Sequence, residues 1–125
     1  MSRKGFTLIE LLLVVVIIGI LVAIAVPKFA KAKEDAHVVT MKSDLRRLLV
    51  AEEAYFALAL TYSTDKAELD FEESTGVHVT ITYNAGKGWS AEATHDATDR
   101  TCTVSIAPGN GKGVGVTEES VPTCP

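Results

Sequence analysis

The sequence lacks charge over one long stretch near its start. No charged residue occurs at residues 11–26, although the 125-residue chain contains 12 basic and 16 acidic side chains. An uncharged run of this length excludes an ordinary helix exposed to water along its whole circumference. The length of the chain is enough for one domain rather than two.

Basic residues are scarce in the second half of the chain. From Thr61 onward four basic residues stand against ten acidic ones, which gives a net charge of −6. Residues 28–47 contain six basic and three acidic side chains, a net charge of +3. This asymmetry predicts different surroundings for the two segments. General binding of nucleic acid by the acidic half is not expected, because that half would not attract a phosphate backbone.

The sequence also shows no pattern typical of an enzyme or of a metal site. His37, His78 and His95 have no spacing to one another, or to a cysteine, that indicates metal binding. The glycine-rich run at residues 109–115 leads into no predicted helix, so it fits a phosphate-binding loop poorly. We therefore expect no enzyme activity and no cofactor.

Residues 6–26 form an apolar segment of 21 residues whose only charge is Glu10. A helix of this length reaches about 30 Å, the thickness of one hydrocarbon core. A helix is expected there, since lipid offers the backbone no other hydrogen-bond partners. Three interpretations compete: a secretory signal cleaved after Ala25, a plain membrane anchor, or a segment in which Glu10 has a function.

The charged side chain of Glu10 has a high free-energy cost in an apolar environment. An acidic residue at the centre of a membrane costs roughly 2.5–3.5 kcal/mol, and less near the interface, where Glu10 would lie. Either the carboxylate sits at headgroup depth without a role, or it needs a cation inside an apolar environment. The residues alone leave both readings open.

The sequence of residues 5–10 resembles that of a known family, and this resemblance favours the interpretation in which Glu10 has a function. Gly-Phe-Thr-Leu-Ile-Glu follows a short basic leader and precedes an uninterrupted apolar segment. This arrangement resembles the class III signal of the type IV pilin family, and of type IVa-like major pilins in particular, over about residues 1–36. The resemblance implies that prepilin peptidase removes residues 1–5 by cutting between Gly5 and Phe6, and that Phe6 is then N-methylated.

The same resemblance implies a route of assembly. The subunit waits in the inner membrane and is polymerised by a membrane assembly platform into an extracellular homopolymer. The polymer serves adhesion, motility or DNA uptake. Glu10 of one subunit neutralises the new ammonium of Phe6 on another. Gly19 and Pro27 match a glycine and a helix-bending proline of similar pilins, between which helical order can be lost during assembly.

Two further identities remain as alternatives. One is a minor pilin or a pseudopilin of type II secretion, which shares the N-terminal signal. The other belongs to a different class, a secreted binding domain released by cleavage after Ala25.

Residues 28–60 contain neither glycine nor proline and repeat apolar residues at helical spacing. We predict one helix from Phe6 to about Leu60, with residues 6–27 as the membrane and assembly part and residues 28–60 as an amphipathic part. The predicted apolar face consists of Val38, Met41, Leu45, Leu48, Leu49, Tyr55, Phe56 and Ala59. The predicted polar remainder consists mostly of Lys42, Arg46, Arg47, Glu52 and Glu53.

The residue pattern of the segment 61–125 predicts a small sheet. Residues 61–76 connect helix and sheet, and their acidic side chains are expected to be solvated, with a calcium site as the weaker alternative. Apolar residues then alternate at residues 77–83, 89–94 and 102–106, which predicts three antiparallel strands with turns at residues 84–88 and 95–100. The fold class is therefore α+β, with the long helix covering the sheet, and the resemblance implies a pilin fold.

Cys102 and Cys124 are the only cysteines, and both lie in the last quarter of the chain. An even number of cysteines behind an exported-looking N-terminus predicts one disulfide, with two free thiols as the alternative. The bond would close a loop of about 22 residues and stabilise the fold by about 3 kcal/mol. The arrangement resembles the disulfide-bounded C-terminal loop of many type IV pilins.

Overall fold

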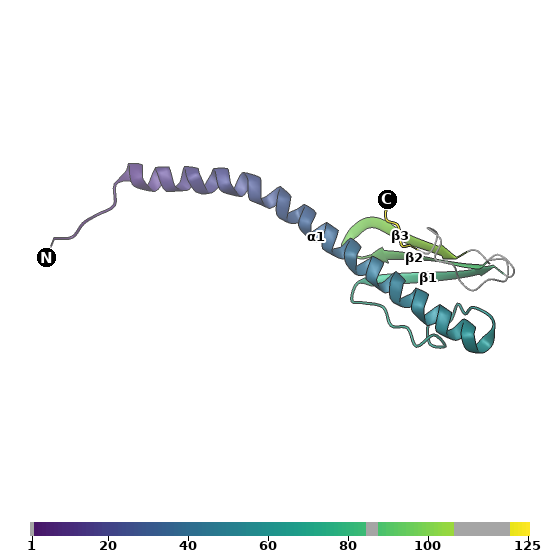
Figure 1. Ribbon diagram of the computed structural model, residues 1–125. Coiled ribbons are helices and arrows are strands. Elements are labelled where there is room, and N and C mark those ends of the chain that lie inside the picture. Colours follow the sequence, from purple (N-terminus) through teal and green to yellow (C-terminus); the bar gives the residue numbers. More distant parts are fainter. Residues whose placement is uncertain (1, 85–87, 107–120) are drawn as a thin grey trace. The chain divides into compact units, whose positions relative to one another are not determined.

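The structure is a computed structural model that describes residues 2–84, 88–106 and 121–125. It contains one helix and a three-stranded antiparallel sheet of order β1-β2-β3 (Figure 1). The elements are α1 (Leu8–Ala59), β1 (Val77–Asn84), β2 (Gly88–His95) and β3 (Thr98–Ile106). The predicted α+β class is confirmed.

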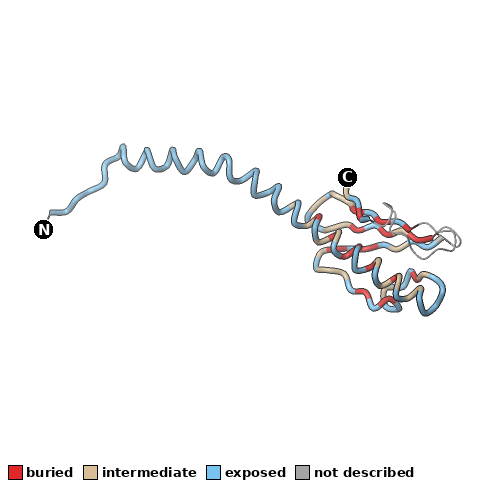
Figure 2. Tube along the Cα trace, viewed as in Figure 1, coloured by how far each residue is buried: buried red, intermediate tan, exposed pale blue. Residues whose placement is uncertain are grey.

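The chain divides into two compact units, Met1–Lys33 and Glu34–Pro125. The first unit holds the N-terminal part of α1, and each of its described residues is exposed (Figure 2). The second unit, called the head below, holds the rest of α1, the sheet and the described C-terminal residues. The centres of the predicted first turn and of the C-terminal loop, residues 85–87 and 107–120, lie outside the described residues.

The sheet follows the alternation of its sequence. Val79 pairs with Ala93, which in turn pairs with Cys102, and all three side chains are buried. The neighbouring row across the strands is Thr80, Glu92 and Thr103, whose side chains are exposed. One face of the sheet is therefore apolar and the other polar, as expected for a half-buried antiparallel sheet.

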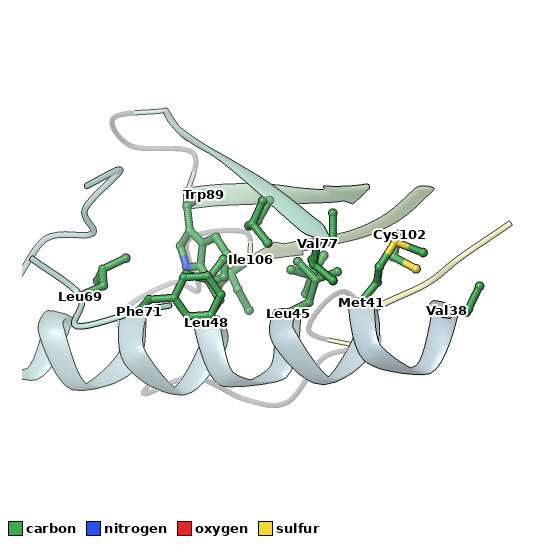
Figure 3. Packing of buried hydrophobic residues seen from close by; sticks show 14 residues of the cluster. Val38, Met41, Leu45, Leu48, Leu69, Phe71, Val77, Trp89, Cys102 and Ile106 are labelled. Atoms are coloured by element: carbon green, nitrogen blue, oxygen red, sulfur yellow. The ribbon is translucent and has the colours of Figure 1, made fainter. Parts of the chain in front are cut away.

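The core of the head lies between the apolar face of the sheet and one side of α1 (Figure 3). Leu45 and Leu48 of α1 point toward Trp89 and Val77 of the sheet, and all four are almost fully buried. The predicted helix face is confirmed at Val38, Met41, Leu45 and Leu48, and it is wrong at Ala59, which is exposed. Phe56 is only half-buried.

Two boundaries differ from the prediction. The turn expected at residues 95–100 is shorter, because β2 continues to His95 and β3 already begins at Thr98. His95 pairs directly with Thr98, and a register irregularity between Ala93 and His95 absorbs the tight connection. His78 is exposed as expected, and its Nε2 lies 2.8 Å from a carboxylate oxygen of Asp96.

The end of α1 is closed by a leucine in an unusual conformation. Leu60 has a φ of 57°, and its N–H donates to the carbonyl of Phe56 over 2.9 Å. This is the left-handed cap that often ends a helix, in which glycine is the usual residue. A side chain with a Cβ costs about 1–2 kcal/mol in this conformation.

Asp44 attaches the connection between helix and sheet to α1. Its carboxylate is buried and accepts from both the N–H and the hydroxyl of Ser74, each over 2.7 Å. The guanidinium of Arg47, one turn along the helix, donates to the same carboxylate over 2.5 Å. Burial raises the pKa of Asp44, but the hydrogen bonds from Ser74 and Arg47 outweigh it and leave the pKa below its usual range.

Glu73 fixes the edge of the sheet in a similar way. Its carboxylate accepts the N–H of Val79 over 2.5 Å and pairs with Lys66. Glu68 accepts the hydroxyl of Ser63 over 2.6 Å. The expectation that the acidic residues of this connection are merely solvated is therefore wrong at Glu73, which is partly buried. Within residues 2–84, 88–106 and 121–125 no group of three metal-binding side chains is close enough to hold an ion.

Replacing Asp44 with Ala should destabilise the head by about 2–3 kcal/mol, because the N–H of Ser74 and the guanidinium of Arg47 lose a charged acceptor. Urea unfolding of the full chain in detergent, followed by the fluorescence of Trp89, measures this. Trp89 is the only tryptophan and is buried in the head, so it reports the head alone. Asp99→Ala, at an exposed position of β3, is the matched control and should change stability little.

Candidate assembly site

The segment before α1 is exposed on every side. Phe6 is 90% exposed, and a Cβ added to Gly5 would meet no atom within 4 Å. Neither residue belongs to a helix or strand. The Gly5–Phe6 peptide bond, where cleavage is predicted, is thus in an extended and open part of the first unit, the kind of backbone on which peptidases act.

Thr7 and Glu10 form a reciprocal cap at the start of α1. The hydroxyl of Thr7 accepts the N–H of Glu10 over 3.3 Å, and Oε2 of Glu10 accepts the N–H of Thr7 over 3.0 Å. This is the capping box, which satisfies two backbone donors that a helix end leaves without partners. It explains why α1 begins at Leu8 instead of the predicted Phe6.

The cap also directs the carboxylate of Glu10. Because Oε2 reaches back to the N–H of Thr7, the negative charge points toward the N-terminus of the chain and lies beside the positive end of the helix dipole. One hydrogen bond occupies one carboxylate oxygen, so the group keeps acceptor capacity for a cation. The sequence pattern contained this signal, Thr-x-x-Glu before an apolar run, but the prediction assigned Glu10 only a partner in another subunit.

Gly19 and Pro27 both lie inside α1. A Cβ at Gly19 would meet nothing within 4 Å, so no close packing in this unit requires glycine there. Pro27 has no N–H, so the carbonyl of Ala23 loses its usual helical donor. The helix is long and apolar enough to cross a membrane, and none of its apolar stretch is buried within the protein. The apolar part of this helix is therefore suited to an apolar environment outside the protein itself.

The predicted disulfide between Cys102 and Cys124 is confirmed. Cys102 is buried in β3, and the neighbouring residues Thr103 and Thr123 exchange two backbone hydrogen bonds of 2.8 and 2.9 Å. The bond and this short antiparallel bridge attach the end of the chain to β3.

The prediction missed a second buried carboxylate in the head. Glu52 was expected on the polar side of α1, but its exposed fraction is zero. Its Oε2 accepts the N–H of Ser63 over 3.1 Å, which ties the turn after α1 to the helix. Its Oε1 has no partner in the part of the chain that the structure describes. Burial, together with the neighbouring charge of Glu53, raises the pKa of Glu52 to about 7, against the opposing hydrogen bond from Ser63.

The histidines also come together in a way that their spacing did not indicate. The rings of His37 on α1 and His95 on β2 lie close together with their centroids 4.1 Å apart and their planes tilted by 31°. Nδ1 of His95 accepts the N–H of Ala97, and the His95 ring lies about 3.1 Å from the place where a side chain on Gly76 would begin. This contact explains glycine at position 76, where φ is also positive.

Comparisons with known proteins agree with these features. The model of the prokaryotic N-terminal methylation motif matches residues 1–26. The type IV major pilin of Myxococcus xanthus is 40% identical over 74 residues, which are 59% of this chain and 34% of the relative. The major component of the type IV narrow pilus of Thermus thermophilus is 65% identical over 37 residues, 30% of this chain and 32% of the relative.

A third relative is the type II secretion system core protein G of Pseudomonas aeruginosa, 42% identical over 54 residues, which are 43% of this chain and 38% of the relative. The chain thus spans about a third of the length of these curated relatives. The methylation motif, the exposed apolar helix and the helix-covered sheet define a pilin-like protein. The N-terminal methylation motif and the similarity to type IV pilins support the type IV pilin family for this chain.

Replacing Glu52 with Gln should change how the stability of the head depends on pH. Glu52 in the folded head keeps its proton up to about pH 7, whereas an unfolded chain releases it near 4.5, so stability falls as pH rises between these values. The loss amounts to roughly 3 kcal/mol. Gln cannot ionise and still accepts from Ser63, so E52Q should match the original chain at pH 4.5 and exceed it by 2–3 kcal/mol, roughly, at pH 8.

Urea unfolding followed by Trp89 fluorescence at both pH values measures this difference. Glu92→Gln removes an exposed carboxylate from the outer face of the sheet and serves as the matched control. The assignment of the pH dependence to Glu52 is wrong when E52Q and the original chain lose stability in parallel from pH 4.5 to pH 8.

Proposed function

We propose that this chain is the structural subunit of a type IV pilus, which polymerises through its N-terminal helix into an extracellular filament for adhesion, motility or DNA uptake. One observation carries the proposal. An exposed apolar helix contains a single charge over residues 6–26, and that charge, Glu10, lies in its first turn beside the predicted cleavage site. The match of residues 1–26 to the methylation motif supports the same reading.

Processing comes first in this proposal. Prepilin peptidase removes residues 1–5, and the new N-terminus at Phe6 is methylated. Residues 6–27 then hold the subunit in the inner membrane, residues 28–60 form the helix of the head, and residues 61–125 supply the connection, the sheet and the disulfide-closed end. The exposure of Gly5 and Phe6 supports cleavage at this bond.

Assembly follows from the charges that cleavage leaves. Cutting after Gly5 creates an ammonium on Phe6, which is as costly in an apolar interior as the carboxylate of Glu10. In the filament, Glu10 of one subunit accepts from the Phe6 ammonium of another. The capping box supports this role, because it directs the carboxylate toward the N-terminal end while leaving acceptor capacity on it.

Such a pair sets register more than it adds stability. A buried ion pair is worth little beyond an apolar substitute, but removing one partner leaves a buried charge that costs about 3–5 kcal/mol. A subunit that enters out of register separates the two charges and incurs this cost. In this proposal cytoplasmic ATPases supply the energy for polymerisation through the membrane assembly platform, and no catalytic chemistry is required of the subunit.

A pseudopilin of type II secretion is the second candidate, and the similarity to the core protein G of Pseudomonas aeruginosa favours it. Both candidates share the N-terminal processing and differ in the filament produced. A secreted domain released after Ala25 is the third candidate, and α1 runs through this position as regular helix. The intact mass of the mature protein separates the third candidate from the first two: an N-terminus at methylated Phe6 fits both pilin and pseudopilin, and one at Val26 fits secretion.

Glu10→Gln tests the assembly proposal with little structural change. Gln at this position of a capping box still accepts from the N–H of Thr7, so only the charge is lost. Leader cleavage and membrane insertion should remain, while the yield of sheared surface fibres should fall at least 100-fold, as expected from about 3 kcal/mol per subunit. Glu10→Val removes charge and cap together and should fall at least as far.

Mass spectrometry of the membrane fraction and immunoblotting of sheared fibres give the two readouts. Thr7→Ser retains the hydroxyl, the cap and the charge, so it is the control that should assemble normally. Fibres at normal yield from the Glu10→Gln chain would show that neutralisation by Glu10 does not direct assembly.

A further inference from the structure

The last turn of α1 exposes apolar side chains that the head does not use. Residues 57–61 are all exposed, and Leu58 and Leu60 are 89% and 79% exposed. One exposed leucine is ordinary on a protein surface. Two leucines separated by one residue, at the end of a helix whose other side packs against the sheet, form a small apolar projection.

Leu60 is also in a conformation that disfavours leucine. Its φ of 57° and the hydrogen bond from its N–H to the carbonyl of Phe56 place it at the position where a left-handed helix cap usually has glycine. In most such caps an apolar residue here contacts the side chain four residues earlier. Leucine at this position therefore has a conformational cost that burial within the head does not offset.

The neighbouring aromatic residues explain why Leu60 points away. The ring of Phe56 stacks on Tyr62 with centroids 4.8 Å apart, and Tyr62 lies 6.2 Å from Trp89 of the core. The ring of Phe56 therefore packs on Tyr62 and not on Leu60. The turn is fixed further by Glu52, which accepts the N–H of Ser63. Leu58 and Leu60 are exposed on a turn that these contacts hold in place, so their association with a partner costs little ordering of the backbone.

We propose that Leu58 and Leu60 dock against the head of a neighbouring copy of this chain in the filament. The small size of this apolar surface indicates that its partner is a second copy of the chain. Two leucine side chains fall far short of the roughly 800 Å² that each partner contributes to a stand-alone complex. A contact this small persists only where another interaction already holds the partners together. In the proposed filament, the apolar helix at residues 6–26 provides that interaction.

The contact is between unlike surfaces. A self-complementary patch would close a dimer, whereas a growing filament needs a surface that meets a different surface on the next copy. This inference rests on the proposed function, since it assumes a polymer of this chain. It adds the head surface that the polymer uses.

Leu60→Gly is the sharpest variant, because it removes the side chain while giving the backbone the residue that this φ favours. The head should be as stable as the original or more so in Trp89-monitored unfolding. Leader cleavage should be unchanged, and the yield of sheared fibres should fall at least tenfold. Val121→Ala, which trims another exposed apolar side chain of the head, should leave the yield unchanged.

A photo-crosslinking amino acid at position 58, in cells that assemble fibres, identifies the occupant. Irradiation should give adducts at multiples of the subunit mass, and peptide mapping should join residue 58 to a different region of a second copy. Adducts only with lipid or with another protein, or normal fibres from Leu60→Gly, overturn the docking inference and leave the pilin function standing. If the unaltered chain makes no fibres in a host with the assembly platform, the proposed function fails, and this inference fails with it.

Discussion

The head depends on the packing of one side of α1 against the apolar face of the sheet. Three short strands with one apolar face are not stable in water by themselves, and a helix end such as residues 34–59 is marginal without a partner. Leu45 and Leu48 meet Trp89 and Val77, so each element buries what the other leaves exposed. Because the three strands form one hydrogen-bonded sheet and the helix is a single element, this one contact fixes the position of the sheet on α1.

Two carboxylates extend that contact to the segment between helix and sheet. Asp44 binds Ser74 at the end of this segment, and Glu52 binds Ser63 near its start. They differ in electrostatic surroundings. Asp44 has Arg47 and two donors on Ser74, so it is stabilised as an anion, whereas Glu52 has one donor and the negative Glu53 beside it. One end of the segment is therefore bound by an ionised group over a wide pH range, and the other end is weakened as pH rises toward 7.

The sequence predicted whatever follows from periodicity and missed what depends on single polar contacts. Alternation at residues 77–83 predicted a half-buried strand with its buried and exposed sides, and spacing of three and four predicted the buried side of α1. Polarity alone placed Glu52 on the surface, and only the three-dimensional position of Ser63 shows that it is buried. Leu60 was missed for a related reason, since a left-handed conformation is expected at glycine or asparagine and nothing in the local pattern indicates it at leucine. The disulfide was predictable because two cysteines allow one pairing.

The capping box gives Glu10 a local structural role, and this role is compatible with a second role between subunits. A helix start in an apolar environment has backbone N–H groups that water cannot satisfy, so an acceptor side chain is favourable there even without a partner charge. Glu10 serves this need through Thr7. Gln would serve it as well, so the cap explains an acceptor at this position but not a negative charge. In the proposed filament the charge needs a cation, and the nearest one that processing would create is the ammonium of Phe6. The chemistry of the site therefore favours glutamate over glutamine only if the leader is removed and the apolar helix is kept.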